Sequence, residues 1–366
     1  MKRNIIIFKL TALLALLLTC EIHSQTFTES KHVEKKFRLG KNTTVDITNK
    51  YGKVHVSTWE KDSVLFRIDL LVKSSSIEKL ESTFESIDFD FSKTEYYVLA
   101  KTIIQSKTGG IISEIVNLAE SMFTQTNHIT IDYHVTLPDD ISLKIENKYG
   151  DIYIDDYKGN FTLTLSNGDL KAGNLTGRSI IDLSFGDGII TSIDKCKMSI
   201  SYGDLSIRQV EDLQVNSKSS KITLETVEFI NMDSKRDKYN MHNVGKIFGD
   251  TYFSDIMLFN INREISLDMK YGLLSVDEIN KNFSLVNLNT EYTDVNIYLK
   301  PQSSYYLDVT HGKEVNLRYP RVDNIQEKKI SDDDKYLTYG NIGTPGAKAK
   351  IKIMAREKGS INIIHK

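Results

Sequence analysis

The chain contains few residues that break or cross-link a fold. It has 4 prolines and 2 cysteines among 366 residues, and because Cys20 lies in the apolar N-terminal segment, Cys196 has no partner for an intramolecular disulfide. There is no Gly/Ser-rich linker and no dense basic tract, and 47 Lys and Arg nearly balance 49 Asp and Glu. These absences argue against separately folded enzymatic modules and against nucleic acid as a partner. We expect stability to come from an extended apolar core, with Cys196 as a buried structural thiol.

Motifs for catalysis and for tight metal binding are also missing. The 8 histidines form no His-Glu-x-x-His pair, and no Gly-x-Ser-x-Gly elbow, P-loop or dinucleotide-binding glycine motif is present. Adjacent carboxylates at 139–140 and 155–156 invite comparison with polysaccharide lyases and hydrolases, but neighbours on a strand point to opposite faces. The sequence therefore predicts a protein that is not an enzyme and needs no cofactor.

The N-terminal segment is typical of export. A positively charged start precedes an apolar run over residues 5–18 and a short polar stretch. Cleavage before Gln25 would remove a signal peptide over residues 1–24, whereas the Leu-Leu-Thr-Cys sequence ending at Cys20 loosely resembles a lipoprotein box and would leave a lipid anchor. No later segment has the run of about 18 apolar residues that a membrane helix needs. Both alternatives predict an exported protein of the periplasm or cell surface, as an outer-membrane lipoprotein if Cys20 is lipidated.

A short phrase recurs along the chain and decides the predicted fold. It reads Lys-Tyr-Gly-Asp-Ile at 148–152, Ser-Asn-Gly-Asp-Leu at 166–170, Ser-Phe-Gly-Asp at 184–187 and Ser-Tyr-Gly-Asp-Leu at 201–205. The third residue of each copy is taken as its reference position, where glycine is expected to supply the positive φ of a tight turn. Degenerate copies continue the series at intervals of 17 to 21 residues, giving the reference positions Gly150, Gly168, Gly186, Gly203, Ser220, Asp237, Ser254, Gly272, Thr293 and Gly312.

Apolar residues keep a constant phase within these repeats, which indicates short strands with one buried face. Two residues after the reference position they include Ile152, Leu170, Leu205 and Ile222, and five residues before it they include Ile145, Leu163, Ile181 and Met198. One such repeat cannot bury its apolar side alone, whereas stacked copies share a core. The sequence therefore predicts an all-β chain, with a parallel β-helix or β-solenoid of about ten rungs of 17–21 residues over 138–366.

Residues 25–137 are predicted to form an N-terminal β unit that contains a further copy of the phrase at 49–54. Two short helices would cap the open end of the stack. The first begins with a possible capping box of Ser75 and Glu78 and carries Ile77, Leu80, Phe84 and Ile87, and the second covers about 110–123. At the other end, 336–342 and 350–364 are expected to be closing strands, with an exposed loop at 331–335 between them and the last rung.

Two columns of the repeat are candidate binding residues. Aromatic residues precede the turn at Tyr149, Phe185, Tyr202, Phe253, Tyr271 and Tyr292. They predict either a structural stacking ladder or a platform for sugars. Aspartates follow the turn at Asp151, Asp169, Asp187 and Asp204. Each could cap its own turn, or neighbouring carboxylates about 4.8 Å apart could be bridged by calcium.

The copies at 49–59 and 146–152, with the Lys-Tyr-Gly at 270–272, resemble a family of adhesin-type β-solenoid domains of bacterial cell envelopes. The resemblance implies an envelope protein and offers no established catalytic residues to transfer. We therefore expect a non-enzymatic interaction protein, an adhesin that presents one solenoid face to a protein or glycan partner. A periplasmic sensor or accessory factor of envelope-stress signalling and a carbohydrate-active β-helix enzyme stay open as alternatives, as does peripheral or lipid-anchored attachment to the membrane.

Overall fold

The computed structural model describes residues 26–105, 128–322, 324–331 and 334–366. These residues form strands and one short helix, α2 (Ile77–Glu85), which confirms the predicted all-β class. No described helix has the length and apolarity to cross a membrane. The first strands are β1 (Phe27–Arg38), β2 (Thr44–Lys50), β3 (Val54–Thr58), β4 (Ser63–Ser74), β5 (Ile87–Lys93), β6 (Tyr97–Ile104), β7 (His128–Leu137), β8 (Ser142–Lys148), β9 (Ile152–Ile154), β10 (Phe161–Ser166) and β11 (Leu170–Ser184). The others are β12 (Gly188–Ser201), β13 (Asp204–Lys218), β14 (Lys221–Lys235), β15 (Lys238–Ile279), β16 (Leu285–Leu299), β17 (Tyr305–Gly312), β18 (Val315–Arg318), β19 (Ile325–Ser331), β20 (Lys335–Ile342), β21 (Lys350–Ala355) and β22 (Gly359–His365).

The chain divides into two compact units. Among the described residues, the smaller unit comprises 26–31, 70–88, 103–105 and 128–130, and the larger comprises 32–69, 89–102 and those from 131 onward. The segment predicted as a signal peptide, 1–24, and the helix predicted over 110–123 lie outside the described residues. The division into 25–137 and 138–366 stays a prediction.

The helix of the smaller unit is shorter than the sequence predicts. Ser76, and not Ser75, is its N-cap, because the Ser76 side chain accepts the Lys79 amide N–H. Leu80 is its buried residue, while Ile77 is 51% exposed. Ile87, which the apolar spacing placed on the helix, begins strand β5 and is buried there.

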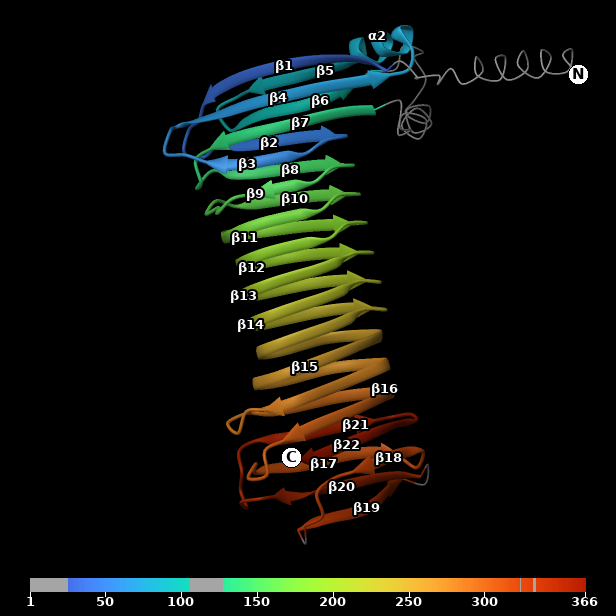
Figure 1. Ribbon diagram of the computed structural model, residues 1–366. Coiled ribbons are helices and arrows are strands. Elements are labelled where there is room, and N and C mark those ends of the chain that lie inside the picture. Colours follow the sequence, from blue (N-terminus) through green and yellow to red (C-terminus); the bar gives the residue numbers. More distant parts are fainter. Residues whose placement is uncertain (1–25, 106–127, 323, 332–333) are drawn as a thin grey trace, which may run out of the picture. The chain divides into compact units, whose positions relative to one another are not determined.

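The larger unit is a stack of parallel strands (Figure 1) in which each copy of the phrase lies on the previous one. Leu163 of β10, for example, pairs with Ile145 of β8 on one side and with Ile181 of β11 on the other. The predicted apolar column also forms, since Leu170 lies opposite Ile152 and Leu205 lies opposite Ile222. All four of these side chains are at most 2% exposed, so successive repeats bury one common core.

The turn at the reference position is built differently from the prediction. The residue with positive φ is the one before the reference position: φ is 59° at Tyr149, 55° at Phe185 and 57° at Tyr202. The glycine is required by close packing instead. A Cβ on Gly186 would lie 1.9 Å from the carbonyl oxygen of Gly168, and one on Gly168 would lie 2.2 Å from that of Gly150. The backbones of successive turns therefore touch, and the side chain before each glycine is held outward in a left-handed conformation.

Both ends of the stack contain strands taken from distant parts of the chain. β2 lies between β6 and β8, and β3 lies between β7 and β9, so the phrase at 49–54 occupies the same column as the later copies. Near the C-terminus, β21 pairs with both β16 and β17, and β22 pairs with both β16 and β18. The strand predicted over 350–364 thus forms an inserted repeat and does not close the end.

The outer strand pairing there is antiparallel. β20, which matches the strand predicted over 336–342, pairs antiparallel with β17 and with β19.

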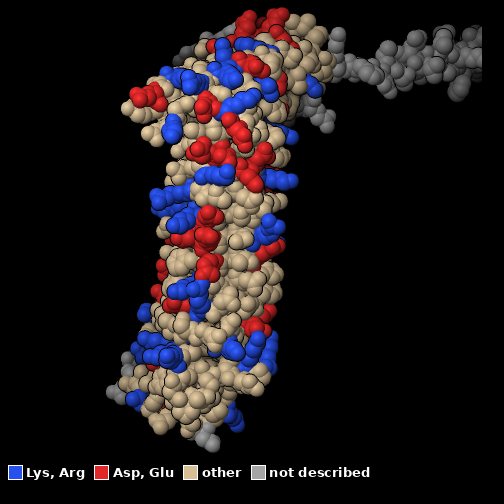
Figure 2. Space-filling view, turned by 90° about the vertical axis from the view of Figure 1, so that its left-hand side faces the viewer, with Lys and Arg blue, Asp and Glu red and all other residues tan. Residues whose placement is uncertain are grey.

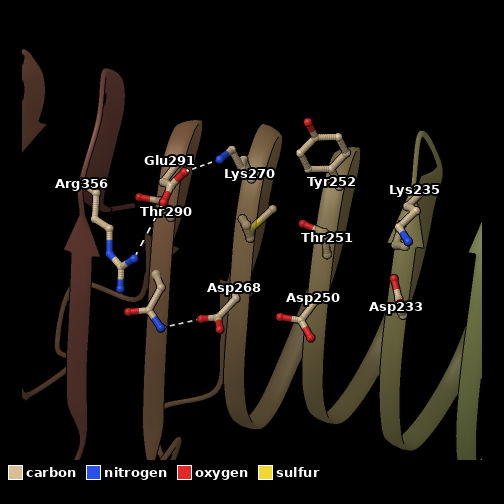
Figure 3. Close-up of a pocket in the computed structure, with 13 residues that line it drawn as sticks. Asp233, Lys235, Asp250, Thr251, Tyr252, Asp268, Lys270, Thr290, Glu291 and Arg356 are labelled. Carbon is tan, nitrogen blue, oxygen red and sulfur yellow. Dashed lines mark hydrogen bonds and ion pairs between the residues drawn. The ribbon is translucent and has the colours of Figure 1, made fainter.

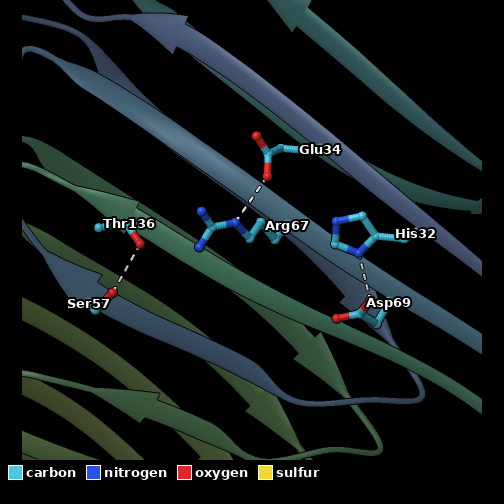
Figure 4. A network of polar contacts seen from close by, with 6 residues as sticks. All are labelled: His32, Glu34, Ser57, Arg67, Asp69 and Thr136. Carbon is cyan, nitrogen blue, oxygen red and sulfur yellow. Dashed lines mark hydrogen bonds and ion pairs between the residues drawn. The ribbon is translucent and has the colours of Figure 1, made fainter.

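Among the first strands of the larger unit, exposed polar side chains form ion pairs (Figure 4): His32 contacts Asp69 at 2.7 Å and Arg67 contacts Glu34 at 3.1 Å. These pairs are exposed and are expected to contribute little to stability.

Candidate functional site

The predicted aromatic residues lie in register along one edge of the stack, the aromatic edge. Phe185 and Tyr202 have ring centroids 5.0 Å apart and planes 7° apart, and Tyr271 stacks on Phe253 at 4.7 Å and on Tyr292 at 5.1 Å. Tyr149 stacks on Tyr51 at 5.5 Å. The residues Phe185, Tyr202, Phe253 and Tyr292 are 45–57% exposed. The structure therefore brings together the aromatic residues that the sequence singled out.

The aromatic edge presents mainly ring edges to solvent, because the face of each ring inside a stack covers the face of the next. The column is interrupted where other residues occupy the same left-handed position, at Asn167 and at the successive repeats of Ser219 and Arg236. A ligand ring could stack on a protein ring only beside such an interruption. The platform suggested by the sequence is thus divided into short stacks.

The turn phrase also contains a buried asparagine whose role the sequence did not reveal. Asn147 is fully buried, and its side-chain amide donates to the carbonyl oxygens of Gly52 (3.0 Å) and Gly150 (2.8 Å). Asn49 does the same for Ile131, at 2.9 Å. These bonds satisfy turn carbonyls that face the interior, which explains the Asn-Lys-Tyr-Gly phrase in structural terms.

The aspartate column links neighbouring repeats. The amide N–H of Asp169 donates to the carboxylate of Asp151 (3.1 Å), that of Asp187 to Asp169 (2.9 Å) and that of Asp204 to Asp187 (2.8 Å). The carboxylates of Asp151, Asp169 and Asp187 thus accept from the turn of the next repeat. The sequence had suggested instead that each aspartate caps its own turn. Among the residues described here, no group of three or more His, Cys, Asp or Glu side chains is arranged to hold a metal ion. Calcium bridging of this column stays a prediction.

Variants of Asp187 separate the structural role from a cation-binding role. Asp187→Ala removes the acceptor for the Asp204 amide and is expected to lower the free energy of unfolding by about 1 kcal/mol. Asp187→Asn keeps an acceptor oxygen and is expected to unfold within a few tenths of a kcal/mol of the parent. Urea unfolding with and without added calcium measures both changes. If Asn destabilises as much as Ala, and does so only when calcium is present, the aspartates bind a cation.

A groove follows the outer surface of the stack beside the aromatic edge (Figure 3) and has a volume of about 600 Å³. One wall is a column of three carboxylates followed by a side-chain amide. The other wall is a column of a lysine, a tyrosine, a second lysine and a glutamate. The first wall consists of Asp233, Asp250, Asp268 and Asn289, and the second of Lys235, Tyr252, Lys270 and Glu291, with Arg356 at the end. The floor is the backbone at Ser234, Thr251, Met269 and Thr290, whose side chains are buried.

Electrostatic contacts fix part of this groove. Lys270 contacts Glu291 at 2.8 Å, which raises the pKa of the Lys270 ammonium and holds the pKa of the Glu291 carboxyl below its usual range. Asn289 donates to Asp268 from the neighbouring repeat. Tyr252 is 40% exposed and makes T-shaped ring contacts with Phe253 and Tyr271, whose ring centroids lie 4.5 and 5.7 Å away. The aromatic edge and the groove therefore form one continuous surface.

The adjacent carboxylates that suggested an enzyme have local partners. Asp156 accepts the backbone N–H and the side-chain amide of Asn174 at 2.8 and 2.9 Å, and these bonds lower the pKa of the Asp156 carboxyl. Asp139 forms an ion pair with Lys158 at 2.7 Å. Cys196 is buried, and burial raises the pKa of its thiol to about 12. These groups stabilise the stack, and none points into the groove.

Sequence reasoning located the aromatic edge but missed the groove. Its carboxylate wall lies four residues before the reference position, at Asp233, Asp250 and Asp268. This recurrence is a signal that could have been found, because outward positions four and two residues before the turn lie side by side on one face. Polar residues at these positions vary between repeats, so they do not stand out as the glycine phrase does.

Comparisons with known proteins give remote likenesses. No protein-family model matches the chain, and no curated protein matches it in sequence. Among solved structures, it is similar to a "putative cell adhesion protein" from Clostridium sporogenes (12% identity, 92% of this chain and 100% of that chain, TM-score 0.20). It is also similar to a "putative adhesin" from Parabacteroides merdae (11%, 73% and 95%, TM-score 0.37) and to a "Putative lipid binding protein" from Parabacteroides distasonis (10%, 91% and 97%, TM-score 0.29). Likenesses this weak carry no argument about function.

Proposed function

We propose that the protein is a non-enzymatic, exported interaction protein of the cell envelope that binds an extended glycan along the groove. In this proposal the larger unit is a β-solenoid of about ten rungs, and its regular rise of about 4.8 Å per rung repeats the same contacts along a polymer. The observation that carries the proposal is the groove itself, with a wall of carboxylates facing a wall that contains Tyr252 and lysines, beside the exposed aromatic edge.

The chemistry of both walls suits sugars. Ionised carboxylates are acceptors only, so Asp233, Asp250 and Asp268 can each accept hydroxyl protons from a polyhydroxylated chain. Lysine ammonium groups on the opposite wall donate to ring and hydroxyl oxygens. Tyr252 adds an apolar ring surface with a polar end, against which a sugar ring can pack.

The arrangement of the carboxylates supports binding without turnover. Hydrolysis of a glycosidic bond requires two carboxyl groups on either side of the scissile bond, one of them protonated near neutral pH. Here Asp233, Asp250 and Asp268 follow one another along a single wall, on the same side of a chain lying in the groove. Glu291, the carboxylate on the opposite wall, is paired with Lys270, which holds its pKa below the usual range, so Glu291 does not supply a protonated acid near neutral pH.

The test is a pair of double variants compared on a glycan microarray, with the strongest array ligand then titrated by calorimetry. Asp250→Asn with Tyr252→Ala changes the groove, and we expect it to weaken glycan binding at least about tenfold. Asp277→Asn with Phe259→Ala is the matched control, because Phe259 is 42% exposed on the same long strand β15 and neither residue lines the groove. We expect the control to bind like the parent protein.

Three results would contradict the proposal. If the parent protein binds no glycan, or if both double variants bind like the parent, the groove is not a glycan site. If incubation with the bound glycan releases shortened products, and Asp250→Asn abolishes the release, the protein is an enzyme. Chromatography of the incubated ligand measures this directly.

A further inference from the structure

Five cations cluster at the longest interruption of the aromatic edge. They lie on the two successive repeats in which Ser219 and Arg236 replace the aromatic residue. Lys218 pairs in register with Lys235, on the groove side of the turn, and Lys221 pairs with Lys238, on the other side. We call this cluster the basic island: Lys218, Lys221, Lys235, Arg236 and Lys238.

The cations of the basic island have no ion-pair partner among the described residues. Several cations on the following repeats do have one. Lys246 contacts Glu264, Arg263 contacts Glu228, and Lys300 contacts Glu278 at 2.8 Å. The side of the stack that faces the viewer in Figure 2 likewise carries Lys and Arg interspersed with Asp and Glu. All five side chains of the island are exposed, so they form a local positive field that is free to act on a ligand.

The nearby carboxylates do not neutralise this field. Asp237, between Arg236 and Lys238, is 2% exposed and directed into the core. Its oxygens accept from the Ser220 and Lys235 amides at 2.8 and 2.9 Å, and from the hydroxyls of Ser217 and Ser234. The exposed carboxylates closest in register are Asp204 and Asp255, on the repeats before and after the island, and Asp233 and Asp250 on the groove wall. Five exposed cations therefore face four exposed carboxylates, and a net positive charge is left.

The island opens onto a hollow of about 300 Å³ lined by Lys218 and Lys235, with Ser199, Asn216 and Ser217 beside them. Asp233 and Lys235 line both this hollow and the glycan groove, so the two are continuous. Aromatic rings stand at both ends of the interruption. Phe185 covers one face of Tyr202, and Lys218 lies 5.7 Å over the Tyr202 ring, while Phe253 stacks on Tyr271 at the far end.

We infer that the basic island is an anion subsite, and that the ligand of the groove is an acidic glycan carrying a carboxylate on some of its sugars. This inference rests on the proposed function and names its ligand class. The ligand must carry few and well-separated negative charges, because the basic island lies beside the carboxylate wall of the groove. An isolated uronate carboxylate fits the island, while the hydroxyls of the neighbouring neutral sugars fit the acceptors Asp233, Asp250 and Asp268. A nucleic acid strand, with one charge per nucleotide, would place phosphates against that carboxylate wall and be repelled.

The experiment titrates the full exported chain with a hyaluronan oligosaccharide, which has one uronate per disaccharide, and with the same oligosaccharide after its carboxyl groups are reduced to alcohols. We expect the acidic form to bind at least about tenfold more tightly at low salt, and we expect the difference to shrink as salt is raised. The triple variant Lys218→Ser, Lys235→Ser and Arg236→Ser should remove the preference. Serine occupies the equivalent positions at Ser201 and Ser219, so the folded stack accommodates it.

The control Lys171→Ser, Lys195→Ser and Arg208→Ser removes the same charge from exposed positions outside the island, and should keep the preference. The single variant Arg236→Ser gives a second readout if the triple variant unfolds early, with a smaller loss of the same preference.

If acidic and reduced forms bind equally, the inference is wrong while the proposed function stands. If neither form binds and the glycan microarray is also blank, both are wrong. If a dT oligonucleotide displaces the acidic form at equal or lower concentration, the island binds nucleic acid and the inference is again wrong.

Discussion

Replacing Gly186 by alanine is expected to lower the free energy of unfolding by about 3 kcal/mol or more. The added Cβ would lie 1.9 Å from the carbonyl oxygen and 2.8 Å from the carbonyl carbon of Gly168. Both atoms are backbone, so no side chain can move aside. The repeats before and after would have to separate locally, which breaks the parallel hydrogen bonds of β12 and weakens the core on both sides of the turn. Urea unfolding followed by circular dichroism measures the change.

Gly312→Ala is the matched control for Gly186→Ala. Gly312 is the last reference position in the sequence, but the nearest atom to a Cβ there is the Arg356 carbonyl oxygen, 3.8 Å away. We expect this substitution to change the unfolding midpoint only slightly, because the extra methyl group meets no backbone. An equal loss of stability in the two variants would contradict the close-packing explanation. It would indicate instead that glycine is needed for its backbone freedom.

The glycine column shows how far the sequence could lead. The recurrence of glycine and the phase of Ile152, Leu170, Leu205 and Ile222 were sufficient to predict parallel stacking, because only a repeated inward face produces that pattern. The reason for the glycine was predicted incorrectly. Positive φ belongs to the aromatic residue before it, and the distance between successive turn backbones is a property of the stacked structure that one repeat does not contain.

The candidate site was predictable to the extent that its residues belong to the recurring phrase. Tyr202, Phe253 and Tyr271 were found because each precedes a reference position, and the structure places them on one edge. The groove and the basic island depend on which outward residues of different repeats become neighbours. Lys218 and Lys235 look unrelated in the sequence and become adjacent only through the register of β13 and β14.

The inserted repeat near the C-terminus was beyond sequence reasoning for a related reason. The echo of the phrase at 358–361 was visible, but its place in the stack is set by long-range pairing and not by chain order. Gly359 lies against the Thr293 carbonyl oxygen, 2.4 Å from a hypothetical Cβ, as Gly168, Gly186 and Gly203 lie against the reference glycines before them. The chain therefore fills a gap between β16 and β17 with residues that come after both.

This topology makes the inserted strand a strong test of the fold. Ile353 is 1% exposed and lies between Leu288 of β16 and Val309 of β17. Ile353→Asp would place a carboxylate in this apolar layer, and we expect it to lower the free energy of unfolding by about 4 kcal/mol, because neither neighbouring strand offers a compensating charge. Thermal and urea unfolding should shift together, and proteases should cleave the released segment from 350 onward.

Lys352→Asp is the control in the same strand, since Lys352 is exposed while the neighbouring side chain of Ile353 points inward. It introduces the same carboxylate one residue away and should alter stability by no more than about 0.5 kcal/mol. If the two variants unfold alike, β21 does not separate β16 from β17 in solution. If only Ile353→Asp is destabilised, residues 350–365 complete the interior of the stack. The strands β17 and β18 then depend on β21 and β22, which follow them in the chain. The C-terminal end of the stack therefore cannot close until β21 and β22 have paired with them.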